Sequence, residues 1–200
     1  MKVKTFTLLV LAVLMTTSFL YGQTARVQII HNSADAAAQQ VDVYLDGSLL
    51  LDDFAFRSAT PFIDAPADAA VDVGIAPQHS TSVDDTLYNA TVTFTSGETY
   101  VVVANGIISG SGYSPAVPFD LYVYAMGQEE AQVAGETDVL VFHGSTDAPT
   151  VDVAEPELAL GLLDDLAYGA FSPGYLNLAT DDYSLQVQND EGTAAVAQFG

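Results

Sequence analysis

Apolar and polar residues alternate with a period of two along most of the chain, which is typical of β-strands that bury one face. Near the start of the pattern, Val27, Ile29 and His31 share one face. Helical periodicity is absent, and Val, Thr and Tyr, which favour strands, dominate the apolar runs. The pattern predicts strands near residues 27–31, 41–45, 48–52, 61–64, 70–76, 88–95, 99–105 and 120–126.

One turn is specified by its own residues. Asp46-Gly47 separates two apolar runs, and this dipeptide is a strong signal for a two-residue hairpin whose central residues both need positive φ. A hairpin between residues 41–45 and 48–52 is therefore predicted. The equivalent position further along the chain holds Glu155-Pro156-Glu157, and proline cannot adopt positive φ, so that turn should differ in type or length.

The chain contains the same pattern twice. Residues 27–56 hold VQIIHNSADA, VDVYLDG and LLDDFAF, and residues 139–168 hold VLVFHGSTDA, VDVAEPE and LLDDLAY. Two copies of one pattern predict two copies of one fold, each with its own core. The matched polar residues are His31 with His143, Ser33 with Ser145, Asp35 with Asp147, Asp42 with Asp152, and Asp52-Asp53 with Asp164-Asp165.

Short strands at this spacing predict an all-β protein made of tandem antiparallel β-sandwich domains of the immunoglobulin-like kind. Nothing in the second copy matches residues 99–106 or 120–126, so we expect it to lack about two strands, as in a fragment of a longer gene product. The expected organisation is a signal peptide at 1–22, a first domain at 24–127, a linker at 128–137 and an incomplete second domain at 138–200.

The first residues indicate export. Lys2 and Lys4 precede an apolar run from Phe6 to Met15, and Gly22 is a small residue suited to a cleavage site. The run is shorter than the about 20 apolar residues that a membrane-spanning helix needs. We therefore expect cleavage after Gly22, an exported protein in the extracellular space, at the cell surface or in the periplasm, and no integral membrane segment after cleavage.

The composition of the chain limits the classes of partner and cofactor that the protein can bind. The chain has 4 Lys+Arg against 26 Asp+Glu, a formal net charge of −22. Such a surface repels nucleic acid, so no nucleic-acid partner is expected, and an extracellular partner or surface stays unidentified. The chain has no Cys, which excludes disulfides and thiolate metal sites, and no cofactor is expected. The first domain is expected to be monomeric.

The cluster of His31, Ser33 and Asp35, repeated as His143, Ser145 and Asp147, invites a comparison with hydrolase triads. A triad needs side chains that converge from separate elements, and no G-x-S-x-G motif is present. A structural role is favoured, because the histidine shares a face with core valines and can bond to the following loop, while Ser and Asp close the turn locally. Both rings are predicted to be buried, and His79 is expected to be solvated.

Adjacent acidic residues could also hold calcium, which takes six to eight oxygen ligands. Two neighbouring carboxylates are too few, and no D-x-D-x-D-G loop is present, so roles in turns and strand edges are favoured. A carbohydrate site would need exposed aromatic side chains, for which Tyr113 is the obvious candidate. The acidic pairs are Asp52-Asp53, Asp84-Asp85, Asp164-Asp165 and Asp181-Asp182.

The repeated motif resembles the bacterial secreted domain-of-unknown-function family 4397. The first copy reads Arg26-Val27, His31, Ser33, Asp35-Ala36 and Val41-Asp42-Val43, and the second reads His143, Ser145, Asp147-Ala148-Pro149 and Val151-Asp152-Val153. In the first copy Ala37 replaces the proline, and two extra residues lengthen the loop within Ala38-Gln39-Gln40. The resemblance implies tandem extracellular β-sandwich domains, often within longer surface or secreted proteins, and no established activity or catalytic residues.

These observations predict a non-catalytic exported β-sandwich repeat protein that acts as a surface, spacer or adhesion module. The alternative is a glycan- or calcium-dependent binding module with its ligand held in the loops at strand ends. A hydrolase is the second alternative, and it would rely on Ser33 or Ser145 as its nucleophile.

Overall fold

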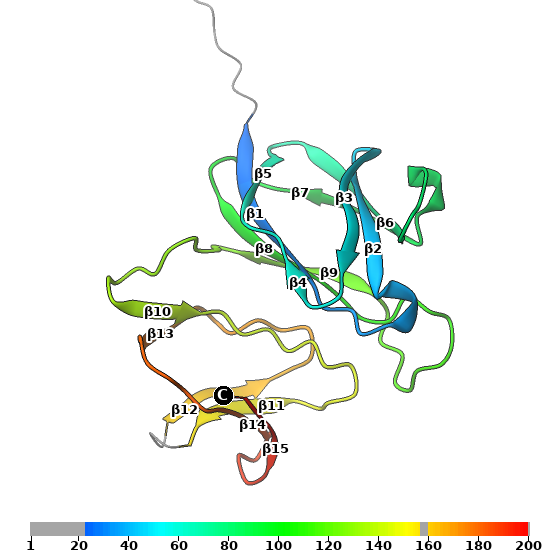
Figure 1. The fold of residues 1–200 in the computed structure, drawn as a ribbon. Helices are drawn as coiled ribbons and strands as arrows, with labels where there is room; N and C mark the ends of the chain where they lie inside the picture. Colours follow the sequence, from blue (N-terminus) through cyan, green and yellow to red (C-terminus); the bar gives the residue numbers. More distant parts are fainter. Residues whose placement is uncertain (1–22, 157–159, 200) are drawn as a thin grey trace, which may run out of the picture.

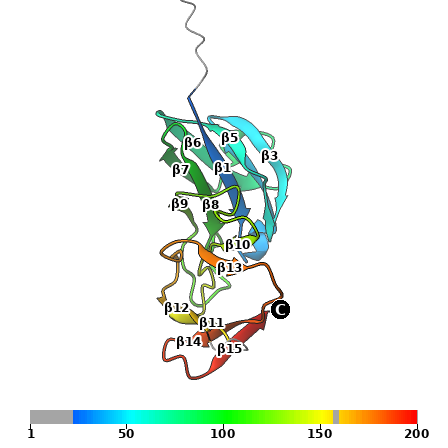
Figure 2. The ribbon, with the colours of Figure 1, turned by 90° about the vertical axis from the view of Figure 1, so that its left-hand side faces the viewer.

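The computed structural model describes residues 23–156 and 160–199. The predicted signal peptide at 1–22 lies outside the described residues, as does Glu157 of the turn predicted to differ from Asp46-Gly47. The described chain consists of strands and loops, with two short 3₁₀ helices, and forms two lobes (Figures 1 and 2). The all-β fold class predicted from the period-two pattern is confirmed.

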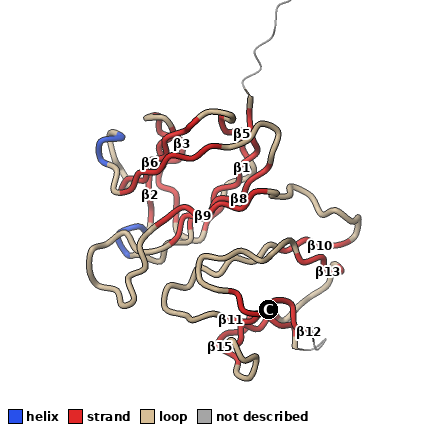
Figure 3. The backbone as a smooth tube through the Cα atoms, turned by 180° about the vertical axis from the view of Figure 1, so that it is seen from behind, coloured by secondary structure: helices blue, strands red, loops and turns tan. Residues whose placement is uncertain are grey.

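The first lobe is a sandwich of two sheets (Figure 3). One sheet contains, in spatial order, β3 (Ser48–Ala55), β2 (Gln40–Leu45), β6 (Ala70–Pro77) and β7 (Tyr88–Thr93). In the other, β1 (Thr24–His31) lies between β8 (Thr99–Asn105) on one side and both β4 (Ser58–Ala59) and β5 (Ile63–Pro66) on the other. β9 (Asp120–Ala125) completes this sheet beyond β8, and the 3₁₀ helices are η1 (Ala36–Ala38) and η2 (Val83–Asp85).

Most strand pairs are antiparallel, as predicted, but β1 and β8 are parallel, with Arg26 opposite Thr99 and His31 opposite Ala104. The period-two pattern is the same for either direction, so the sequence could not reveal this pair. The parallel pair places the end of β1 beside the end of β8. The loops that follow the two strands therefore begin side by side, at the same end of the sheet.

The Asp46-Gly47 hairpin is confirmed, because the two residues join β2 to β3 with φ of 47° and 76°. The predicted strand at 99–105 coincides with β8, and the one at 61–64 is displaced to Ile63–Pro66. The two-residue strand β4 was not predicted, because its pairing with the end of β1 is a tertiary contact that leaves no local pattern.

The core of the first lobe lies between its two sheets, where Val27 and Val102 belong to one cluster of buried side chains and Val43 and Ile75 to another. β8 is buried along its other face as well, since Val101 and Val103 are only 4% and 2% exposed. A strand that is buried on both faces reads as a continuous apolar run, as in the YVVVA of β8.

The second lobe repeats part of this arrangement. β10 (Glu136–Val139) pairs with β13 (Leu176–Ala179), as β1 pairs with β5. The other sheet contains, in order, β12 (Leu160–Leu166), β11 (Val151–Glu155), β14 (Leu185–Asn189) and β15 (Ala195–Phe199), as β3, β2, β6 and β7 do in the first lobe. Among the described residues, β10 has no strand on the side where β1 has β8.

Aromatic side chains join the two lobes. Tyr122 of β9 lies against Phe142, with ring centroids 5.2 Å apart, and Tyr124 lies against Phe171 and Tyr175 at 5.3 and 6.0 Å. The β10–β13 pair lies beneath the sheet formed by β1, β8 and β9 in Figure 1. The second lobe thus covers the outer face of this sheet and accounts for the burial of Val101 and Val103.

Candidate functional site

The repeated motif begins with a buried histidine at the end of β1. The ring of His31 is 1% exposed and packs between the rings of Phe54 and Phe56. Its Nε2 lies 2.7 Å from the carbonyl oxygen of Ala38, to which it donates, and its Nδ1 accepts from the amide of Ser33 at 3.4 Å. Burial lowers the pKa of His31, which therefore stays neutral with both nitrogens hydrogen-bonded.

Ser33 and Asp35 are also buried, both at 0% exposure, and they bind the loop after β8. The hydroxyl of Ser33 donates to the carbonyl oxygen of Gly106 at 2.6 Å. The carboxylate of Asp35 accepts four hydrogen bonds of 2.6–2.9 Å, from the amides of Ala37, Ile108 and Ser109 and the hydroxyl of Ser109. The motif therefore fastens the end of β1 to the loop between β8 and β9.

The hydrogen bonds to Asp35 also decide its charge. Burial by itself raises the pKa of this carboxyl group, but the donors from Ala37, Ser109 and Ile108 together lower it below the ordinary value of 3.8. Asp35 is therefore ionised at neutral pH, and its negative charge is balanced by N–H and O–H dipoles rather than by a cation.

The prediction that the ring of His31 is buried and bonded to its own following loop is confirmed. The prediction that Ser33 and Asp35 close the turn locally is only partly right. Asp35 caps η1 through Ala37, but three of its four hydrogen bonds come from residues 73 or 74 positions away. The contribution of Ile108 and Ser109 was not visible in the sequence, because it depends on the parallel pairing of β1 with β8.

In the second motif the histidine makes the same hydrogen bonds as His31, but the serine and the aspartate lie in different surroundings. His143 is 6% exposed, its Nε2 lies 2.8 Å from the carbonyl oxygen of Pro149, and its Nδ1 accepts from the amide of Ser145 at 3.4 Å. The prediction of a buried ring at the equivalent place is confirmed. The side chains of Ser145 and Asp147, however, are not bound by a distant loop: both residues are exposed, and the Ser145 hydroxyl donates to Asp147 Oδ1 at 2.9 Å.

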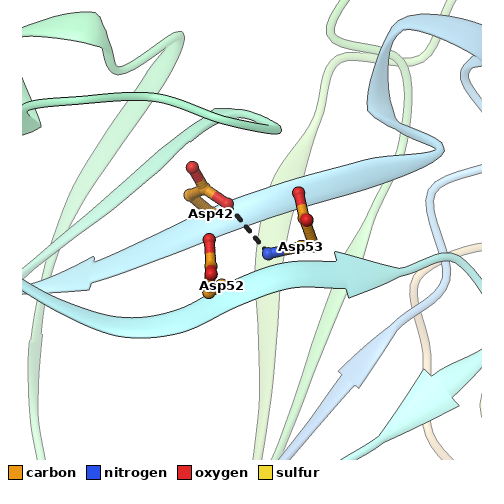
Figure 4. A group of neighbouring side chains, drawn as sticks. All are labelled: Asp42, Asp52 and Asp53. Atoms are coloured by element: carbon orange, nitrogen blue, oxygen red, sulfur yellow. Dashed lines mark hydrogen bonds between the residues drawn. The ribbon is translucent and has the colours of Figure 1, made fainter.

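Three carboxylates converge at the start of the β2–β3 hairpin (Figure 4). Asp42 lies on β2 and is fully buried, while Asp52 and Asp53 lie on β3, and oxygens from the three groups lie within 4.8 Å of one another. The amide of Asp53 donates to Asp42 Oδ1 at 2.9 Å, where the β2–β3 register shifts and Asp53 has φ of 50°. Asp42 therefore stabilises a β-bulge.

The same cluster recurs in the second lobe with Asp152, Asp164 and Asp165. The amide of Asp165 donates to Asp152 Oδ1 at 2.9 Å, and φ of Asp165 is 53°. The sequence predicted strand-edge roles for both acidic pairs but did not bring the buried Asp42 or Asp152 to them. The repeated spacing of these aspartates was the only available signal.

The two clusters differ in electrostatics. Burial raises the pKa of Asp42, but hydrogen bonds from Ser80 and the amide of Asp53 outweigh it and lower the pKa. Ser80 donates to Asp42 Oδ2 from its amide at 2.8 Å and its hydroxyl at 2.6 Å, so both Asp42 oxygens are hydrogen-bonded. In the second cluster the charge of Asp165, followed by that of Asp152, raises the pKa of Asp164.

Tyr113 and His79 are the two remaining residues for which the sequence suggested an exposed side chain. The hydroxyl of Tyr113 accepts from the amide of Ala36 at 2.6 Å, and the residue is half-buried, so this candidate for a carbohydrate site is less exposed than its loop position suggested. The loop after β8 folds back over η1 and brings Tyr113 there. His79 is solvated as expected, with its side chain 75% exposed and 3.3 Å from Asp53.

The remaining acidic pairs lie in turns, as predicted. Asp85 forms a capping box with Ser82 at η2, and Asp181 accepts from the amide of Asp182 in an exposed bend.

Between the sheets of the first lobe lies an apolar cavity of about 60 Å³, lined by side chains that include Val43, Phe54 and Val102. It is smaller than the ~150 Å³ apolar cavity known to admit benzene.

The fold and the motif together define a class of all-β sandwich proteins in which a His-x-Ser-x-Asp segment binds the loop of a neighbouring strand. The model of the family described as Domain of unknown function (DUF4397) matches residues 25–154, and the chain belongs to this family. The match covers the first lobe and ends within β11 of the second. No curated protein matches the chain. No helix of the described residues is long and apolar enough to cross a membrane.

Proposed function

We propose that the protein is a non-catalytic, exported bacterial protein of tandem β-sandwich domains that acts as a surface, spacer or adhesion module. The observation that carries the proposal is the use of the repeated polar motif. His31, Ser33 and Asp35 direct their hydrogen bonds to Ala38, Gly106, Ile108 and Ser109 rather than to one another as a triad.

The tandem arrangement is supported by matched local geometry. His31 and His143 bond to the carbonyl group of their own following loop, at 2.7 and 2.8 Å. Asp42 and Asp152 each accept the amide of a residue with positive φ. Independent segments would have no reason to share these details, so residues 138–200 are proposed to be a second, partial copy of the domain.

A spacer role is supported by the contact between the lobes. Asn105, only 1% exposed, donates from Nδ2 to the carbonyl oxygen of Gly144 at 3.0 Å and lies 2.9 Å from the hydroxyl of Tyr168. Together with the tilted and edge-to-face aromatic pairs between the lobes, these buried contacts oppose hinge motion, since a polar group left unpaired there would be costly. A rigid two-lobe body can hold attached groups at a fixed separation.

Export and surface exposure are tested by producing the full chain in a Gram-negative host. Mass spectrometry should find a mature chain that begins at Gln23, and protease added to intact cells, or to the medium, should reach the protein. A full-length chain retained in the cytoplasm would overturn the proposal. A version that lacks residues 1–22 is the matched control for leakage.

The hydrolase alternative is tested with a panel of ester, amide and glycoside substrates. Ser145→Ala is the informative variant because Ser145 is exposed, so the change should leave the fold intact. No turnover is expected from the parent protein. Turnover that disappears in Ser145→Ala or Ser33→Ala would establish catalysis and overturn the proposal.

The binding-module alternative is tested by calorimetric titration with calcium. Asp42 and Asp152 are buried and each accepts a backbone amide, so we expect no saturable heat of calcium binding and an unchanged melting curve. Saturable binding that is lost in Asp164→Asn and retained in Asp181→Asn would favour calcium-dependent binding. The same titration with oligosaccharides tests the glycan form of the alternative.

A further inference from the structure

One asparagine side chain, that of Asn105 at the end of β8, connects the two copies of the motif. Its Oδ1 accepts from Asn32 Nδ2 at 2.9 Å, and its Nδ2 donates to the carbonyl oxygen of Gly144 at 3.0 Å and to the hydroxyl of Tyr168 at 2.9 Å. Asn32 and Gly144 are the residues between the histidine and the serine of the two motifs. At 1% exposure, Asn105 is closed to solvent in the contact between the lobes.

The residue after Asn105 is a glycine, and the backbone around it requires one. Gly106 has φ of 101°, and a Cβ atom on it would meet the backbone of Pro118 and Phe119. Asn105-Gly106 is the one Asn-Gly pair in the sequence. Asparagine loses its side-chain nitrogen most readily in such a pair, because glycine has no side chain to hinder attack by its backbone nitrogen. A chemically labile pair is therefore kept at the contact between the lobes.

The reaction open to this pair needs water and no other reactant. The backbone nitrogen of Gly106 attacks Cγ of Asn105, and the new C–N bond closes a five-membered succinimide ring. The bond from Cγ to the side-chain nitrogen breaks, and this nitrogen leaves as ammonia with the proton of the Gly106 amide. Water then adds to one of the two ring carbonyl groups and opens the ring, which gives aspartate or isoaspartate at position 105.

The closed molecule keeps the reacting atoms out of position. Ring closure requires Cγ of Asn105 to turn onto the nitrogen of Gly106, whereas three hydrogen bonds hold the side-chain amide where it is. Gly106 is held as well, because its carbonyl oxygen accepts from the hydroxyl of Ser33 at 2.6 Å. Two of the three hydrogen bonds to the amide come from the second lobe, at Gly144 and Tyr168. Separation of the lobes would therefore free the side chain and admit water together.

We propose that Asn105 is a deamidation site whose reactivity is controlled by the packing of the lobes. It is protected while the lobes are in contact and reacts once they separate. The product prevents the contact from forming again, because a carboxylate cannot donate to the carbonyl oxygen of Gly144 and isoaspartate adds a methylene group to the main chain at the end of β8. The inference goes beyond the proposed function, because it depends neither on export nor on the absence of catalysis.

Gly144 allows the contact to be opened without any change to the first lobe. A Cβ atom at this position would meet Asn32 Nδ2 and would lie 3.1 Å from Asn105 Oδ1, so Gly144→Ala should separate the lobes at Asn105. Gly174→Ala is the matched control. Gly174 also belongs to the second lobe, but it has no positive φ and nothing lies near its Cβ position.

The test follows deamidation of the full chain at neutral pH. Digestion and mass spectrometry identify the modified asparagine, and a methyltransferase specific for isoaspartate identifies the product. In urea, where the chain is unfolded, Asn105 should react faster than any other asparagine, whereas in the folded parent it should stay intact. Gly144→Ala should raise the rate at Asn105 at least about tenfold above that of the parent, because opening becomes frequent, and Gly174→Ala should not.

The structural consequence is tested with Asn105→Asp, which makes the aspartate product directly. Protease should release the second lobe of this variant at least about tenfold faster than that of the parent, because the carbonyl oxygen of Gly144 loses its donor. Asn89→Asp is the same chemical change at an exposed position, and it should behave like the parent.

Three results would overturn the proposal. The first is a rate at Asn105 in the folded parent equal to the rate in urea. The second is a rate at Asn105 that neither Gly144→Ala nor Phe142→Ala increases, which would assign the protection to the first lobe alone. The third is an Asn105→Asp protein that resists protease as well as the parent does, since the modification would then have no effect on the contact.

Discussion

Replacing Asp35 by asparagine should destabilise the first lobe, although the two side chains have nearly the same shape. Asp35 Oδ1 accepts from the amide of Ala37 and the hydroxyl of Ser109, and Oδ2 accepts from the amides of Ile108 and Ser109. An asparagine has one acceptor oxygen. Whichever way its amide is oriented, its NH₂ group faces two of these donors.

The size of the effect follows from those contacts. Hydrogen bonds to a charged group contribute about 1.5–3 kcal/mol each, and at least two are lost. The Ser109 hydroxyl can rotate to accept from the new amide, which recovers part of one of them. We therefore expect the free energy of unfolding to fall by about 3–5 kcal/mol, a large part of the ~5–15 kcal/mol that stabilises a typical domain.

The chain provides its own control, because Asp147 occupies the same place in the second motif, where it is exposed and accepts a hydrogen bond from Ser145. Asp147→Asn should change the free energy of unfolding by less than about 0.5 kcal/mol. Urea denaturation followed by circular dichroism measures both variants, and hydrogen exchange at Ile108 and Ser109 reports the loop directly. Equal effects of the two substitutions would refute the reasoning.

Three other changes test separate parts of the structure. Gly47→Val should lower the free energy of unfolding, measured by urea denaturation, by about 1–2 kcal/mol, because φ of Gly47 is 76° and a β-branched residue is strained there. Gly110→Val is the control: Gly110 has no positive φ and nothing lies near its Cβ position, so the free energy of unfolding should not change. Phe142→Ala should lose about 2–4 kcal/mol of packing between the lobes and speed proteolytic release of the second lobe, and unchanged proteolysis would contradict the aromatic contact. The folded pKa values of Asp35 and Asp42 lie below their ordinary 3.8, so their stabilisation is complete above that pH and is lost as the pH falls through the lower folded values. The melting temperature should therefore fall more steeply below pH 4 in the parent than in Asp35→Asn, and parallel curves would contradict the assigned pKa direction.

The sequence alone was enough for elements that local chemistry decides. Strand β8 was predicted with its correct bounds, because a run of β-branched apolar residues between two turns strongly favours a strand. The Asp46-Gly47 hairpin followed from the need for positive φ, which these residues meet at low cost. Burial of His31 and His143 followed from their sharing a face with core valines, since strand periodicity fixes the direction of each side chain.

Only the tertiary structure decided what those side chains meet. The parallel pairing of β1 with β8 brings Ile108 and Ser109 to Asp35, and neither strand carries a sign of its neighbour or of its direction. The β-bulge that brings Asp42 close to Asp52 and Asp53 depends on the register in which β2 pairs with β3. Two copies of the His-x-Ser-x-Asp motif thus have different surroundings: Ser33 and Asp35 are covered, and Ser145 and Asp147 are exposed. A sequence pattern determines which groups a segment offers, whereas their partners come from residues distant in the chain, whose positions depend on packing of the whole molecule.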